Sequence, residues 1–183
     1  MTFRVVFLCT GNRFRSPLAA AVLRRETEGL PVEVDSAGIL ELGPVPALPE
    51  ALFEAERLGL DLRGHQACSV GEADLAGADL VVGFERMHVR TAVVEGGARR
   101  EVTFTLPELV ALLGRIEPPS AADPLERARM SVELAHADRP QDPTLADAPE
   151  LADPLGRPAA YQRETAERVA SLTTALARAL FRA

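Results

Sequence analysis

The chain has 183 residues, of which 47% are hydrophobic and 26% are charged, and its formal net charge at pH 7 is −7. Such a chain is long enough for one domain with a substantial core, so we expect a single domain over residues 1–183. The negative charge argues against a nucleic-acid partner held by bulk electrostatics. Each apolar stretch is shorter than the roughly 20 residues of a membrane helix, so no membrane partner is expected.

Strand and helix signals alternate along the chain. The first apolar run ends at Cys9 and is followed by Ser16 and Pro17, a pair that favours a helix start with Ser16 as the capping residue. In chain order we expect a strand at Arg4–Cys9, a helix at Ser16–Glu28, a strand at Val32–Asp35, a helix at Leu48–Leu58, a strand at Asp79–Phe84, a helix at Glu85–Val94, a strand at Glu101–Leu106, and helices at Pro107–Leu113, Leu125–Ala137 and Ala159–Phe181.

This alternation of strands and helices predicts an α/β fold. Continuous apolar strands separated by helices are typical of a parallel sheet covered on both faces. We therefore expect a three-layer sandwich with a central four-stranded parallel sheet. Ligands bind beyond the carboxyl ends of the strands in such sheets, and Cys9 closes the first strand.

Prolines and aspartates are concentrated between the fourth strand and the last helix. We interpret residues at about 115–152 as a proline-rich insertion in the domain. Long excursions of this kind are usually functional. Our hypothesis is that the insertion folds over the site as a lid.

The segment between the first strand and the first helix reads Cys-Thr-Gly-Asn-Arg-Phe-Arg-Ser-Pro, from Cys9 to Pro17. Its amides can form a nest at the positive end of the helix, where they favour an anion and the thiolate form of Cys9. Arg15 can hold an oxyanion with two prongs. The residues thus predict a phosphate- or sulfate-like anion bound over a nucleophile. The expected loop members are Thr10, Gly11, Asn12, Arg13, Phe14 and Ser16.

At these residues the chain resembles the low-molecular-weight protein tyrosine phosphatase family, whose loop reads Cys-x-Gly-Asn-x-x-Arg-Ser-Pro. Ser36-Ala37-Gly38 after the second strand and Asp153-Pro154 before the last helix match as well. The resemblance covers Arg4–Leu113 and Asp153–Phe181. It implies a flavodoxin-like fold and a phosphatase that acts on a phosphorylated protein or a small phosphoester, with no metal and no organic cofactor.

The resemblance also implies roles for individual residues. Cys9 would attack phosphorus and form a phosphocysteine, and Arg15 would bind the phosphoryl oxygens. Asp153 would protonate the leaving oxygen and then activate water. The residues expected to support the sulfur and the loop backbone are Ser16, Asn12, Ser36 and His65.

The acid assignment has two rivals, because Asp123 and Asp142 also precede a proline. We prefer Asp153 because Gly156 and the terminal helix follow it, as in the family. Aspartates before proline are otherwise common turn residues.

The chain departs from the family around the expected substrate pocket. Leu155 and residues 39–42 stand where many members carry an aromatic residue, and Phe14 replaces a frequent second loop cysteine. Aromatic walls sandwich a phosphotyrosine ring, so the expected substrate is a phosphotyrosine-like, other aryl or acidic phosphoester. Arg13 in the loop is compatible with an acidic substrate.

Two alternatives remain from the sequence. Thioredoxin-linked arsenate reductases are similar in loop and fold, but their relay cysteines would fall near Glu85 and Ala92, which leaves Cys68 or an external thiol as reductant. A phosphate-binding module without turnover would not need Asp153.

The remaining chemistry-bearing residues are few. Two cysteines make no disulfide framework and favour a cytoplasmic location. The three histidines are scattered and predict no metal site. We expect His88 and His136 at the surface, and Met87 in the core.

Overall fold

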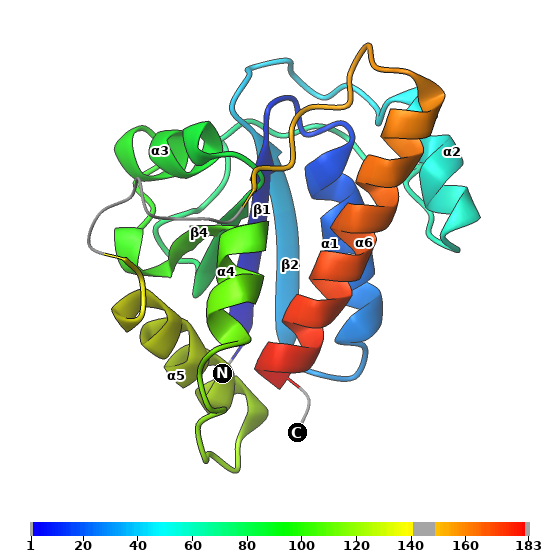
Figure 1. Ribbon diagram of the computed structural model, residues 1–183. Helices are drawn as coiled ribbons and strands as arrows, with labels where there is room; N and C mark the ends of the chain where they lie inside the picture. The colour runs from blue at the N-terminus through cyan, green and yellow to red at the C-terminus, as the bar shows by residue number, and fades with distance from the viewer. Residues whose placement is uncertain (1, 141–148, 182–183) are drawn as a thin grey trace.

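The computed structural model describes residues 2–140 and 149–181. Its centre is a parallel sheet with strand order β2-β1-β3-β4 (Figure 1). The strands are β1 (Phe3–Cys9), β2 (Val32–Gly38), β3 (Leu80–Gly83) and β4 (Thr103–Thr105). The helices are α1 (Arg15–Glu26), α2 (Pro49–Arg57), α3 (Arg86–Val94), α4 (Leu106–Leu113), α5 (Pro124–Ala137) and α6 (Ala159–Phe181). The predicted four-stranded parallel α/β sandwich is confirmed.

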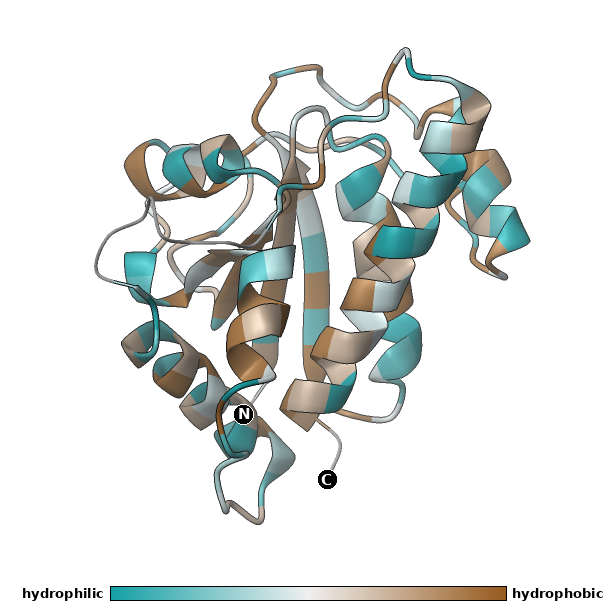
Figure 2. Ribbon diagram, in the orientation of Figure 1, coloured by the Kyte–Doolittle hydropathy of each residue, from teal (hydrophilic) through white to brown (hydrophobic). Residues whose placement is uncertain are grey.

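Strand β1 separates two apolar clusters, because successive side chains of a strand point to opposite faces. Phe7 packs in the larger cluster with residues of α1 and α6, whereas Val6 and Leu8 pack with Ala92 of α3. In Figure 2 the edge strand β2 alternates between hydrophilic and hydrophobic residues along its length. The sheet is therefore covered on both faces, and the carboxyl end of β1 lies inside the molecule.

The predicted fourth strand at Glu101–Leu106 is too long at both ends. Residues Arg100–Val102 form a turn of 3-10 helix, and α4 begins at Leu106. The cause is a capping box: the amide of Glu108 donates to Oγ1 of Thr105 over 3.3 Å, and the Thr105 amide donates to the Glu108 carboxylate over 3.1 Å.

The insertion does not place its helix over the carboxyl ends of the strands. Arg129 of α5 donates to Oδ1 of Asp79 over 3.0 Å and to the carbonyl of Thr2 over 2.8 Å. Both acceptors precede strands, so α5 packs at the amino-terminal end of the sheet (Figure 1). The lid hypothesis is therefore wrong for Pro124–Ala137, and residues 141–148 lie outside the described residues.

Within the described ranges, no helix combines the length and the apolar character that crossing a bilayer requires.

Candidate active site

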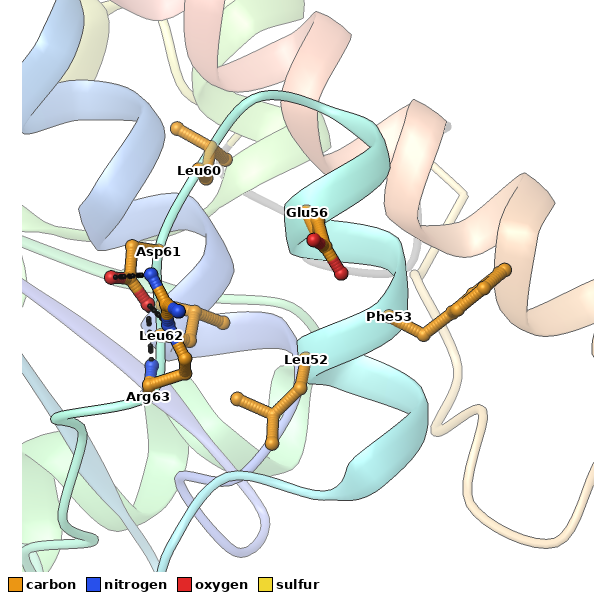
Figure 3. Close-up of a pocket in the computed structure, with 7 residues that line it drawn as sticks. All are labelled: Leu52, Phe53, Glu56, Leu60, Asp61, Leu62 and Arg63. Carbon is orange, nitrogen blue, oxygen red and sulfur yellow. Dashed lines mark hydrogen bonds and ion pairs between the residues drawn. The ribbon is translucent and has the colours of Figure 1, made fainter.

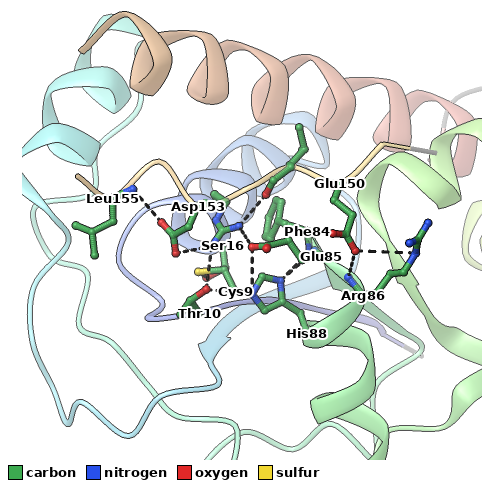
Figure 4. A network of polar contacts seen from close by, with 12 residues as sticks. Cys9, Thr10, Ser16, Phe84, Glu85, Arg86, His88, Glu150, Asp153 and Leu155 are labelled. Carbon is green, nitrogen blue, oxygen red and sulfur yellow. Dashed lines mark hydrogen bonds and ion pairs between the residues drawn. The ribbon is translucent and has the colours of Figure 1, made fainter. Parts of the chain in front are cut away.

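The Cys9–Arg15 loop joins the end of β1 to the start of α1. Cys9 is the last residue of β1 and is paired with Gly38 of β2, while Arg15 is the first residue of α1. Asn12, in the middle of the loop, is buried and has a φ of 53°. The predicted position of the loop at the carboxyl end of the sheet is thus observed (Figure 4).

Ser16 contacts the sulfur of Cys9. The Ser16 Oγ and Cys9 Sγ atoms are 3.0 Å apart, and Asn12 donates from Nδ2 to the same hydroxyl over 2.9 Å. The hydroxyl thus accepts from Asn12, and its hydrogen can go to the sulfur at 3.0 Å or to the carbonyl of Ala37 at 3.4 Å. The expectation that Ser16 caps α1 is wrong, because the helix begins one residue earlier and no side chain caps it.

The left-handed conformation of Asn12 is held by contacts with three further residues. Its Nδ2 atom also donates to Ser36 Oγ over 2.8 Å, and its Oδ1 atom accepts from the amide of Cys68 over 2.9 Å. The His65 Nε2 atom lies 2.6 Å from the Asn12 carbonyl and must donate to it. Burial lowers the pKa of His65. The sequence-predicted residues Ser36 and His65 therefore both lie against the loop.

Arg15 is the buried cation of the site, with only 1% of its surface exposed. Its Nη1 atom donates to the Glu85 carboxylate and, over 2.7 Å, to the carbonyl of Leu151. Its Nη2 atom donates to Thr10 Oγ1 over 2.9 Å and to Asp153 Oδ2 over 2.6 Å. A planar fork with fixed donors suits such a set of acceptors, which a lysine could not satisfy.

Asp153 reaches the site on the segment that precedes α6. Leu151 is held at both backbone groups, since its amide donates to the Phe84 carbonyl over 3.0 Å and its carbonyl accepts from Arg15. Two residues later, Asp153 Oδ1 accepts from the Leu155 amide over 3.0 Å while Oδ2 binds the arginine. The structure therefore brings Asp153 to the loop.

Of the two rival aspartates, the structure describes only Asp123, and it lies away from the site. Asp123 is the N-cap of α5, where its Oδ1 atom accepts from the Leu125 amide over 3.2 Å. That helix lies at the opposite end of the sheet. Asp142 lies outside the described residues.

A cleft of about 90 Å³ opens over the loop and is lined by Cys9, Arg15 and Asp153. Its other walls are largely aliphatic, and two of its leucines are well exposed: Leu40 at 48% and Leu155 at 63%. The remaining lining residues are Thr10, Gly11, Arg13, Phe14, Leu42 and Leu48. Arg13 is anchored at the rim, where its Nε atom donates to the Pro46 carbonyl over 2.8 Å.

A larger hollow of about 320 Å³ lies beside α2 (Figure 3). Its charged residues Asp61 and Arg63 are hydrogen-bonded to each other, with Nε–Oδ1 and Nη2–Oδ2 distances of 2.9 and 2.7 Å. Its lining contains no thiol and no hydroxyl group. Over the described part of the chain, no group of three or more residues is arranged to hold a metal ion.

Glu85 and His88, which follow the carboxyl end of β3, were not predicted to contribute to the site. His88 was expected at the surface but is completely buried. Its Nδ1 atom accepts from the amides of Phe84 and Glu85, over 3.3 and 3.1 Å. Burial and the nearby Arg15 lower the pKa of His88 to about 3. The sequence did offer one indication that His88 lies at the site: it follows a strand of the predicted parallel sheet closely, and ligands bind beyond the carboxyl ends of such strands.

The assignment of Met87 to the core was also wrong, because 50% of its surface is exposed. In α3 it precedes His88, which occupies the inward side of the helix.

Comparisons with known proteins identify the family of this chain. Residues 4–131 match the sequence model of the family described as low molecular weight phosphotyrosine protein phosphatase. A protein-arginine-phosphatase of Bacillus subtilis is 37% identical over 111 residues, which cover 58% of this chain and 71% of the relative. A probable low molecular weight protein-tyrosine-phosphatase, EpsP of Ralstonia nicotianae, is 31% identical, over 72% of this chain and 84% of the relative.

The crystal structure of a low molecular weight protein tyrosine phosphatase from T. tengcongensis superimposes with a TM-score of 0.70 at 28% identity, and covers 96% of this chain and 97% of that one. The family match covers the Cys9–Arg15 loop, and the structural match covers nearly the whole chain. The chain therefore belongs to the low molecular weight phosphotyrosine protein phosphatase family, and it is a hydrolase of the phosphatase class with an active-site cysteine.

Proposed function

We propose that this chain hydrolyses phosphate monoesters through a phosphocysteine on Cys9, with Arg15 binding the phosphoryl group and Asp153 as general acid and base. The observation that carries the proposal is the meeting of a thiol, a guanidinium and a carboxylate in one cleft. Thiol nucleophile, oxyanion clamp and proton donor are the parts that covalent phosphoryl transfer requires.

In the first step the Cys9 thiolate attacks phosphorus, so that an S–P bond forms as the ester P–O bond breaks. Asp153 gives its proton to the leaving oxygen. In the second step the Asp153 carboxylate takes a proton from water, whose oxygen attacks phosphorus as the S–P bond breaks. Inorganic phosphate leaves, and the Ser16 hydroxyl at 3.0 Å stabilises the returning thiolate.

Arg15 serves both steps by binding the phosphoryl group. An incoming phosphate, or a sulfate-like anion, takes over the Nη2 donor that Asp153 Oδ2 occupies at 2.6 Å. This exchange directs the acid away from the arginine and toward the leaving oxygen. Glu85 stays on the other nitrogen and keeps the guanidinium plane in position.

The substrate we propose is a phosphorylated protein, with a phosphotyrosine-like ester in the cleft. The shallow cleft and the exposed side chains of Leu40 and Leu155 suit the apolar stem of one phosphorylated side chain. Arg13 at the rim suits acidic residues beside it. Free thiols at Cys9 and Cys68 are consistent with a cytoplasmic location.

The arsenate reductase alternative has less support. Cys68 lines a different hollow from Cys9, and burial raises its pKa, which disfavours the thiolate that a disulfide relay needs.

The deciding experiment is one panel of substrates with the wild-type chain. It contains 4-nitrophenyl phosphate, a phosphotyrosine peptide, a phosphoarginine peptide, and arsenate with glutathione or with thioredoxin and its reductase. We expect hydrolysis of the two aryl phosphates. Turnover of the phosphoarginine peptide alone would replace the proposed substrate, arsenate turnover alone would replace the reaction, and binding of phosphate with no turnover would indicate a silent module.

A further inference from the structure

Thr10 has a hydroxyl that touches two donors at the edge of the cleft. Its Oγ1 atom lies 2.9 Å from Nη2 of Arg15 and 3.2 Å from Nε2 of His88 (Figure 4). The guanidinium has no acceptor, so it donates to the threonine oxygen. The direction of the second contact depends on where the histidine carries its proton.

The backbone settles the protonation of His88. The amides of Phe84 and Glu85 both donate to Nδ1, at 3.3 and 3.1 Å, so this nitrogen carries no hydrogen. A neutral imidazole has its hydrogen on the other nitrogen, Nε2. His88 is wholly buried, and its lowered pKa agrees with the neutral ring. His88 therefore donates to Thr10.

A hydroxyl oxygen has two acceptor sites and one hydrogen. Arg15 and His88 fill both acceptor sites. Among the described residues no acceptor contacts the remaining hydrogen. That hydrogen is a donor, and Thr10 lines the cleft that contains the Cys9 sulfur.

We propose that Thr10 is a further substrate-binding residue, whose hydroxyl donates a hydrogen bond to a phosphoryl oxygen, and that His88 is the residue that positions this hydroxyl. The inference rests on the proposed phosphatase reaction. The Nη2 atom that binds Thr10 is the same one that binds Asp153, so the hydroxyl stands beside the place where phosphoryl oxygens bind Arg15. A donor fixed before the reaction stabilises developing charge without reorganisation.

The first test compares Thr10→Val, which keeps the shape and removes the hydroxyl, with Thr10→Ser, which keeps the hydroxyl. For 4-nitrophenyl phosphate we expect Thr10→Val to lower kcat/KM roughly 10–100-fold, up to the low end of the range for one preorganised donor. The inhibition constant of vanadate should rise in step. Thr10→Ser should stay within about 3-fold of the wild type, within the usual context dependence of a single hydrogen bond.

Thr173→Val is the matched control, because it removes a buried hydroxyl from α6 that donates to the Val169 carbonyl over 2.7 Å. It should leave kcat/KM unchanged. If Thr10→Val and Thr10→Ser lowered kcat/KM equally, the proposed role of the hydroxyl would be wrong. The same holds if Thr10→Val did not lower kcat/KM at all. A wild-type chain without Cys9-dependent turnover would instead overturn the proposed function.

The second test isolates His88. In His88→Asn the amide oxygen replaces Nδ1 as acceptor for the Phe84 and Glu85 amides, but the shorter side chain cannot reach Thr10. We expect kcat/KM to fall several-fold with Thr10 present and not to fall further in the Thr10→Val background. The same loss in both backgrounds would show that His88 acts only on the structure, and would overturn its positioning role.

Discussion

The Nη2 atom of Arg15 lies 2.6 Å from Oδ2 of Asp153, across 138 positions of the sequence. The pair joins the start of α1 to the segment before α6. It therefore places the proposed phosphate clamp next to the proposed acid. Substitutions that act on either end of this contact have distinct and measurable effects.

Replacing Cys9 by serine should abolish turnover of 4-nitrophenyl phosphate, because an alcohol at this position is a far weaker nucleophile than a thiolate. The fold should be retained, since serine fills nearly the same volume. Steady-state rates and circular dichroism measure the two effects. Cys68→Ser is the control and should keep full activity; residual turnover in Cys9→Ser comparable to the wild type would rule out the covalent route.

Replacing Asp153 by alanine should lower kcat roughly 10²–10⁴-fold for an ester with a poor leaving group, the range typical of a lost general acid. The loss should be much smaller for 2,4-dinitrophenyl phosphate, whose leaving oxygen needs little protonation. The measurement is kcat against the pKa of the leaving phenol, which should become steeper in the variant.

Asp123→Ala is the matched control for the acid. It removes the N-cap of α5, which should lower the free energy of unfolding by about 1 kcal/mol and leave kcat unchanged. If Asp123→Ala or Asp142→Ala steepened the dependence on the leaving group and Asp153→Ala did not, the acid assignment would be wrong.

Gly38 is tightly packed against the Cys9–Arg15 loop. A Cβ atom at this position would lie 2.9 Å from the Asn12 amide nitrogen and 2.9 Å from the Gly11 carbonyl carbon. We expect Gly38→Ala to displace the loop, to reduce kcat/KM at least roughly 10-fold as its donors move, and to lower the free energy of unfolding by about 1–3 kcal/mol. Gly71→Ala, where a Cβ meets nothing within 4 Å, should change neither quantity.

The buried His88 should make stability depend on pH. Its pKa is about 3 in the folded chain and 6.5 as a free side chain, so only the unfolded state binds this proton between those values. The neutral ring contributes its full stability above pH 6.5, and that contribution is lost as pH falls toward 3, by about 1.4 kcal/mol per pH unit.

Urea unfolding of the wild type and His88→Asn at several pH values measures this contribution. We expect the free energy of unfolding of the wild type, relative to that of His88→Asn at the same pH, to decrease as pH falls from 7.5 to below 6.5. The lowered pKa of His65 acts with the same sign in both proteins and cancels in the difference. A difference that does not vary with pH would mean that His88 titrates normally in the folded chain.

The sequence predicted the features that depend on local pattern. Apolar runs and their spacing gave the order of the elements, and the position of Cys9 after a buried strand gave the place of the site. Asp153 was placed through the resemblance, because the contact with Arg15 spans most of the chain and leaves no local signal.

The features that were missed depend on tertiary packing. A single histidine carries no sign of burial, and His88 is buried because α3 turns back against the end of β3. Ser16 has the right type and place for a cap, but its hydroxyl is engaged by Cys9 and Asn12. The lid hypothesis placed the insertion, which includes α5, over the site. It failed for α5 because composition does not indicate which end of a sheet a segment covers.

The backbone hydrogen bonds of Leu151 limit how far the carboxylate of Asp153 can move. Both backbone groups of Leu151 are bonded, to Phe84 and to Arg15, and Asp153 follows only two residues later. Two trans peptide units span at most about 7 Å between Cα atoms. While these bonds hold, the Asp153 carboxylate can move only a short distance, so the proposed transfer of this carboxylate from Arg15 to the leaving oxygen requires only a local movement of the chain.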